Sequence, residues 1–89
     1  MTAQSSGCVT VQYWAAARAA AGCSSEQCEA ATVGEALAVV TQRHGERLRA
    51  VLARCSFLVD GAPVGRRDPG TVPVSPGNVI EVLPPFAGG

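Results

Sequence analysis

The stretch that decides the fold is Val79-Ile80-Glu81-Val82-Leu83, followed at once by Pro84-Pro85. Its β-branched and apolar residues predict a strand, and their continuity predicts that both faces of this strand are buried. Proline has no backbone N–H and holds φ near about −65°, so the two prolines end the ladder of the sheet. The sequence therefore predicts a buried strand that leads directly into a stiff, extended arm.

Working outward, the first thirty residues predict two strands around a short helix. Residues 8–14 alternate, with Val9, Val11 and Tyr13 on one face, as in a half-buried strand. Residues 15–21 are alanines interrupted by a single arginine, which favours a helix that Gly22 ends. Residues 24–31 predict a weaker strand, antiparallel to the first.

The middle of the chain predicts the main helix and the remaining strands. Thr32 and Glu35 form a capping box, which begins a helix that ends at Gly45. The further expected elements are a helical segment at 46–53, a central strand at 56–59, a turn at 60–61, a loop at 62–76 with one short edge strand at 71–74, and a turn at 75–78. This order favours an α+β domain with one mixed sheet packed against the helix that begins at Thr32.

Composition limits the classes of function. A hydrophobic fraction of 47% is enough for a core, which makes general disorder an unsuitable reading. The formal net charge is zero, so we expect no nucleic-acid partner. No apolar run approaches the roughly 20 residues that a membrane span needs, and we expect no membrane partner. All seven basic residues are arginine, which excludes any mechanism that uses a lysine amine of this chain.

The chain contains four cysteines and one histidine, which are the residue types that form disulfides or bind metal ions. The cysteines are Cys8, Cys23, Cys28 and Cys55. The N-terminal segment has no apolar region of the secretory kind, so we expect a cytoplasmic protein with reduced cysteines. The spacings contain no C-x-x-C and no second histidine, so no metal site is predicted. His44 lies at a predicted helix C-terminus, where a cation suits the helix dipole.

The segment after the last strand has the features of a functional tail. Phe86 offers an apolar anchor. The residues after it, Ala87, Gly88 and Gly89, have small side chains or none. Glycines pass narrow channels and let a backbone approach a reactive group closely. We expect Gly89 to be the C-terminal residue, so that its carboxylate is the functional group at the tip. A partner can capture such a carboxylate with backbone donors.

Two motifs resemble those of the ubiquitin-like sulfur carriers, and above all the molybdopterin synthase small subunits. The family's aromatic-small pair followed by Arg and Gly matches Trp14-Ala15, Arg18 and Gly22. Its Pro-Pro-x-x-Gly-Gly ending matches the residues at positions 84–89. One departure is the turn before the last strand, which is acidic in the family and reads Ser-Pro-Gly-Asn at positions 75–78 here.

The resemblance implies a ubiquitin-like β-grasp domain at 1–83 and a flexible functional tail at 84–89. It implies that an ATP-using, ubiquitin-activating-like adenylyltransferase activates Gly89, and that a sulfurtransferase or cysteine desulfurase system converts it to a thiocarboxylate. The large synthase subunit, in an expected heterotetramer, would then bind the tail from Pro84 to Gly89. Sulfur would pass to a cyclic pyranopterin monophosphate and form the dithiolene of the molybdenum cofactor. The chain itself would bind no cofactor and catalyse nothing alone.

Two alternatives remain open from the residues. The chain is a sulfur carrier for another pathway, such as thiamin thiazole, cysteine or tRNA thiolation, or it is a β-grasp interaction module that carries no sulfur. Arg18 is a possible contact to a partner, although a solvated or intramolecular salt bridge is the simpler interpretation.

Overall fold

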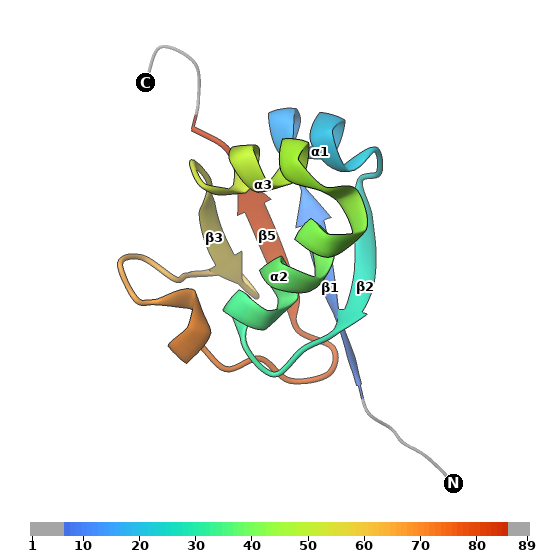
Figure 1. Ribbon diagram of the computed structural model, residues 1–89. Helices are drawn as coiled ribbons and strands as arrows, with labels where there is room; N and C mark the ends of the chain where they lie inside the picture. Colours follow the sequence, from blue (N-terminus) through green and yellow to red (C-terminus); the bar gives the residue numbers. More distant parts are fainter. Residues whose placement is uncertain (1–6, 86–89) are drawn as a thin grey trace, which may run out of the picture.

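The computed structural model describes residues 7–85 and contains a five-stranded mixed sheet with the strand order β2-β1-β5-β3-β4 (Figure 1). The strands are β1 (Cys8–Tyr13), β2 (Ser25–Glu29), β3 (Ser56–Val59), β4 (Ala62–Pro63) and β5 (Val79–Leu83). The helices are α1 (Ala15–Ala21), α2 (Val33–His44), α3 (Glu46–Leu52) and a 3-10 turn, η1 (Pro69–Thr71). The predicted α+β class is confirmed, as are the strands and helices expected before residue 60.

Strand β5 lies in the middle of the sheet, parallel to β1 and antiparallel to β3. Its inward residues, Ile80 and Val82, are fully buried. The prediction that both faces of this strand are buried is wrong, because Val79, Glu81 and Leu83 are partly exposed. The helices cover only one face of the sheet. The continuous apolar run therefore belongs to a strand with one buried and one open face, and not to a strand buried on both faces.

Helix α2 runs across the covered face of the sheet, in front of β1 and β5 in Figure 1. Its capping box is confirmed, since the Thr32 hydroxyl oxygen accepts the Glu35 N–H at 3.0 Å. The Glu35 carboxylate reaches back one residue further than expected and accepts the N–H of Ala31 at 2.6 Å. The core between the helices and the sheet consists of buried apolar side chains, the largest being Tyr13, Leu48, Ile80, Val9, Val11, Val33, Val40 and Val82.

The segment 62–76 differs from its prediction. The edge strand is β4, which pairs with β3, and not residues 71–74. Residues 71–74 form only an isolated bridge between Thr32 and Pro73, because a proline cannot donate to a ladder. Val72 and Val74 instead bury their side chains in the core. As a result β3 lies between β5 and the two-residue β4, and the central strand is β5 rather than β3.

The two predicted turns are present and joined to each other. Asp60 and Gly61 have φ angles of 49° and 86°, the left-handed values that a tight Asp-Gly hairpin turn requires. The Asp60 carboxylate accepts the backbone N–H of Val79 at 2.8 Å and the side-chain amide of Asn78 at 2.6 Å. These bonds fix the start of β5 and therefore the direction in which the strand runs towards its C-terminal end.

The remaining expectations concern membranes and cysteines. Among the helices of residues 7–85, none has the length and apolar character needed to cross a membrane. All four cysteines are free thiols, so no disulfide is formed. Cys28 is buried as a packing residue, as predicted, whereas Cys8 is exposed.

Candidate functional site at the end of β5

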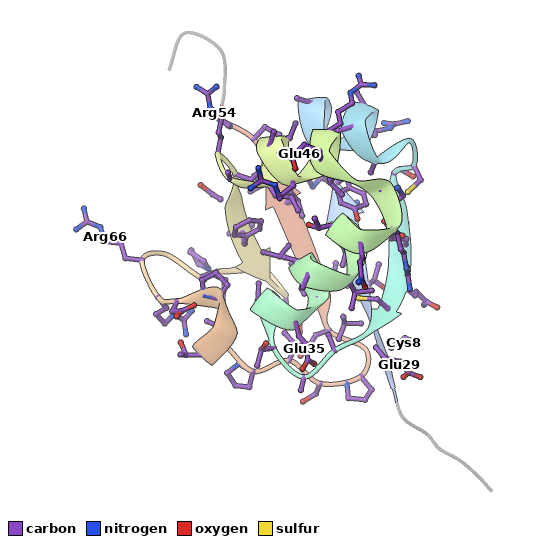
Figure 2. All side chains as sticks on the ribbon, in the orientation of Figure 1. Cys8, Glu29, Glu35, Glu46, Arg54 and Arg66 are labelled. Carbon is purple, nitrogen blue, oxygen red and sulfur yellow. The ribbon has the colours of Figure 1, made fainter. Side chains whose placement is uncertain are left out.

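The C-terminal end of β5 directs the chain away from the sheet. Pro84 is buried and Pro85 is exposed, so the first proline still belongs to the domain and the second begins the arm. The two prolines line a shallow hollow with Ala16, Val51 and Arg54, where α1 and α3 meet. Figure 2 shows Arg54 at this end of the molecule. The predicted tail residues Phe86, Ala87, Gly88 and Gly89 lie outside the described residues, and their roles stay predictions.

Trp14 is a large exposed apolar side chain next to this exit. It is 43% exposed, and its indole Nε1 donates to the Glu81 carboxylate at 3.3 Å. Its backbone N–H donates to the carbonyl of Val82 at 3.2 Å, which holds the residue beside β5. Sequence reasoning used Trp14 only as part of a motif. The alternation of residues 8–14 already placed it on the face opposite Tyr13, which was the available signal.

The open face of the sheet carries several apolar side chains besides Trp14. The register pairs Leu58 of β3 with Glu81 of β5, so both lie on the open face together with Val79 and Leu83. The three apolar side chains among them are partly exposed. The open face of β5 therefore carries apolar side chains that the helices do not cover, and one of them, Leu83, directly precedes the arm.

Arg18, which the sequence offered as a possible partner contact, lies on α1 with an exposed side chain. Its backbone carbonyl accepts the N–H of Gly22, whose φ of 78° ends the helix as predicted. Within residues 7–85 the Arg18 guanidinium makes no ion pair, so the intramolecular salt bridge is not formed there. Its role as a partner contact stays a prediction.

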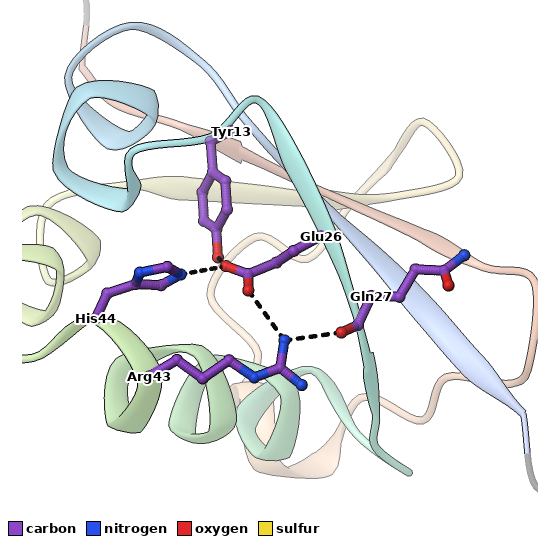
Figure 3. A network of polar contacts seen from close by, with 5 residues as sticks. All are labelled: Tyr13, Glu26, Gln27, Arg43 and His44. Atoms are coloured by element: carbon purple, nitrogen blue, oxygen red, sulfur yellow. Dashed lines mark hydrogen bonds and ion pairs between the residues drawn. The ribbon is translucent and has the colours of Figure 1, made fainter.

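A second polar site, which we call the Glu26 network, consists of Tyr13, Glu26, Arg43 and His44 and was not predicted (Figure 3). The Glu26 Oε2 atom accepts the Tyr13 hydroxyl at 2.5 Å and lies 2.6 Å from His44 Nε2. The Oε1 atom accepts from Arg43 Nη1 at 2.9 Å. The same Arg43 nitrogen donates to the Gln27 carbonyl at 2.8 Å. These bonds tie β1 and β2 to the C-terminal turn of α2.

The network shifts the pKa values of its members. Partial burial of Glu26 opposes its ionisation, but the hydrogen bonds from Tyr13, Arg43 and His44 outweigh that effect and lower the carboxyl pKa. Burial and the bond to Glu26 raise the pKa of the Tyr13 phenol. Burial, followed by the nearby Glu26 charge, raises the pKa of the Cys23 thiol. Glu26 is therefore an anion and Tyr13 a hydrogen-bond donor at neutral pH.

The single histidine has a different partner from the one its position predicts. His44 does end α2, but its ring contacts Glu26 and lies edge-on to Tyr13, with centroids 6.5 Å apart. Glu26 and His44 are separated by 18 residues in sequence, so the contact cannot be predicted from a local sequence pattern. The fold also brings Cys23 to this place, where the ligand atoms of Cys23, Glu26 and His44 lie within 4.8 Å of one another.

The strand order, the single long helix across one face and the strand that leads into a terminal arm define a ubiquitin-like β-grasp domain. The model of the ThiS family matches residues 11–89, so this chain belongs to the ThiS family. The match reaches the last residue of the predicted tail. The resemblance to ubiquitin-like sulfur carriers is thereby confirmed for family and fold.

Solved structures show the same fold at low sequence identity. Small archaeal modifier protein 1 from Methanosarcina acetivorans is 21% identical, with a TM-score of 0.81 over 93% of this chain and 97% of that one. A chain from the complex of subunits 1 and 2 of the molybdopterin-converting factor of Helicobacter pylori 26695 is 23% identical, with a TM-score of 0.69 over 92% and 99%. Urm1 from Trypanosoma brucei is 13% identical, with a TM-score of 0.70 over 93% and 96%. A search of curated proteins found no match.

Proposed function

We propose that this chain is the sulfur-carrying small subunit of a molybdopterin synthase. In this proposal the Gly89 carboxylate becomes a thiocarboxylate, and its sulfur is donated to cyclic pyranopterin monophosphate to form the molybdopterin dithiolene. The observation that carries the proposal is the direct passage from the central strand β5 into Pro84-Pro85, within a family match that continues to Gly89.

The chemistry needs activation from outside the chain. A carboxylate is a poor electrophile, so an adenylyltransferase would use ATP to form the mixed anhydride of Gly89 with AMP and release pyrophosphate. A sulfurtransferase or cysteine desulfurase system would then supply sulfur at the sulfide level, which attacks the carbonyl carbon and displaces AMP. The chain provides no acid or base for these steps in the proposal. Its contribution is to present one backbone terminus.

The architecture supports presentation of that terminus. Asp60 fixes the start of β5, neighbouring strands hold its length, and buried Pro84 anchors the base of the arm. A stem that is already stiff loses less conformational entropy when it docks. The five residues from Pro85 to Gly89 reach at most about 17 Å, which is enough to enter the active site of a partner.

The partner we propose is the large synthase subunit, in a heterotetramer. The complex of subunits 1 and 2 in the Helicobacter pylori structure supports a two-subunit arrangement. Leu83 and exposed Trp14 give this chain apolar side chains beside the arm, and Leu58 and Val79 continue the apolar surface along the open sheet face. Arg18 of α1, whose side chain is exposed, is a further candidate for contact with this partner.

Intact mass spectrometry tests whether the chain is a carrier. After incubation with ATP, an active adenylyltransferase and a sulfur source, we expect a gain equal to the mass difference between sulfur and oxygen. A cysteine persulfide would instead add a whole sulfur atom, so the two products are distinct. No gain, with a partner that is active on another carrier, would favour the interaction module that carries no sulfur.

The pathway is tested by reconstitution with the large synthase subunit. The thiocarboxylate form should bind that subunit and convert cyclic pyranopterin monophosphate to the dithiolene product. The variant Trp14→Ala removes the exposed apolar side chain but keeps the tail. We expect it to bind the large subunit more weakly and still to form the thiocarboxylate. A chain that accepts sulfur but fails to form dithiolene would belong to thiazole, cysteine or tRNA thiolation instead.

A further inference from the structure

We propose that Cys23, Glu26 and His44 form a binding site for one Zn²⁺ ion. This inference does not depend on the proposed function. The three ligand atoms are the Cys23 sulfur, a Glu26 carboxylate oxygen and a His44 ring nitrogen, all within 4.8 Å of one another. Sequence spacing predicts no metal here, because Cys23 lies in the turn before β2, Glu26 lies in β2 and His44 ends α2.

The geometry is close to that of a bound ion. Zinc bond lengths of about 2.0–2.3 Å in a tetrahedron place neighbouring ligand atoms roughly 3.3–3.8 Å apart. Glu26 Oε2 and His44 Nε2 are now 2.6 Å apart, so they must separate by somewhat less than an ångström. The Cys23 sulfur lies no more than 4.8 Å from either atom, so it must approach by at most about 1.3 Å. All three side chains are only partly buried, so an ion can reach them from solvent.

The chemistry of the three donors fits zinc. Thiolate, imidazole and carboxylate are all zinc ligands, and three protein ligands leave a fourth position for water. A thiolate and a carboxylate balance the two positive charges of the ion. On binding, the Cys23 thiol would release its proton to solvent, and neutral His44 would bind through Nε2 with its proton on Nδ1. The metal would replace the hydrogen bond that now links His44 to Glu26.

The residues around the three ligands would form a supporting shell. Carboxylates that bind metals are commonly held by further hydrogen bonds. Tyr13 and Arg43 hold the two oxygens of Glu26 in this way, at 2.5 Å and 2.9 Å. The Glu26 network explains the positions of Tyr13, Arg43 and His44 without a metal. Cys23 is not part of this network: its thiol makes no hydrogen bond with the residues described, and its side chain packs against the edge of the core, which leaves the sulfur available to a metal.

Cobalt substitution in the full-length, reduced, metal-free protein tests this site. Co²⁺ bound by a thiolate gives a sulfur-to-metal charge-transfer band, which Zn²⁺ should abolish on displacement. We expect one equivalent of Co²⁺ to produce the band in the wild type and in the control Cys8→Ser, since Cys8 lies outside the cluster. Cys23→Ser should lose the band. His44→Gln should weaken Zn²⁺ affinity by at least about tenfold, because disturbing only an outer-shell partner of a ligand already costs about that much.

Three results would overturn the proposal: no band with the wild type, a band kept by Cys23→Ser, or equal Zn²⁺ affinity in the wild type and both variants. Circular dichroism of each metal-free variant checks folding. If His44→Gln fails to fold, Cys23→Ser decides alone, because the Cys23 thiol makes no described hydrogen bond whose loss would unfold the domain. A thermal shift provides a second readout: saturating Zn²⁺ should raise the melting temperature of the wild type but not of Cys23→Ser.

Discussion

The C-terminal end of β5 and the Glu26 network are two polar or functional regions built in opposite ways. The first is continuous in sequence, since the strand, the two prolines and the proposed tail follow one another from Val79 to Gly89. The second is assembled from β1, β2 and α2, and its central contact joins residues 18 apart. A carrier terminus can therefore be predicted from residues that are adjacent in sequence, whereas a polar cluster such as the Glu26 network forms only when the fold is complete.

The largest effect should come from removing Gly89. Deletion of this residue should abolish thiocarboxylate formation, because the reacting carboxyl group would then belong to a different residue at a shorter reach. The melting temperature should not change, since the described domain already ends its strands at Leu83. Intact mass spectrometry and a thermal melt measure the two quantities. A variant that still gains sulfur at its terminus would remove the special role of Gly89.

The next effect should come from the platform under the tail. Ile80→Ala deletes a fully buried side chain of the central strand and should cost about 2–5 kcal/mol of unfolding free energy. Val79→Ala is the matched control, because the neighbouring residue lies on the open, partly exposed face. Urea denaturation should show a clearly smaller loss for the control. Equal losses would mean that the two faces of β5 are equally buried in solution.

The Glu26 network should contribute less than the core. Glu26→Gln, measured in the presence of a metal chelator, should cost about 1–3 kcal/mol, because it removes the charge that accepts bonds from three side chains. Glu46→Gln is the control, since Glu46 pairs with Arg49 on an exposed helix surface. We expect no measurable change there. If both substitutions are neutral, the network does not hold β2 against α2.

The smallest effect should come from the start of α2. Thr32→Ala removes the hydroxyl that accepts the Glu35 N–H and should cost about 1 kcal/mol. Thr32→Ser keeps the acceptor and should retain most of the wild-type stability. Chemical denaturation of the three proteins gives the ranking. A serine variant as unstable as the alanine variant would place the effect in the lost methyl group instead of the cap.

Much of the fold could be predicted because local signals agreed with one another. Alternation revealed β1, the Thr32–Glu35 pair revealed α2, and the Asp60-Gly61 pair revealed the hairpin turn. The prediction for residues 62–76 was wrong for a physical reason. The prolines of this segment prevent regular strand pairing, and its valines are buried although they form no strand. The open face of β5 was also missed, because an apolar run has the same composition whether or not the helices cover both faces.

The candidate sites divide along the same line. The tail could be proposed from sequence because proline, glycine and chain direction act locally. The Glu26 network could not, because strong partners such as Glu26 and His44 meet only after β2 and α2 have packed. The position of Cys23 beside them depends on the same packing.

The central claim is that Gly89 carries the sulfur, and peptide mapping after the sulfur-transfer reaction tests it most directly. All basic residues are arginine and the last is Arg67, so trypsin releases residues 68–89 as one peptide, which contains no cysteine. We predict that this peptide gains the sulfur-for-oxygen mass difference and that fragmentation places it on Gly89. A sulfur found only on peptides that contain Cys8, Cys23, Cys28 or Cys55, with the C-terminal peptide unchanged, would contradict the account.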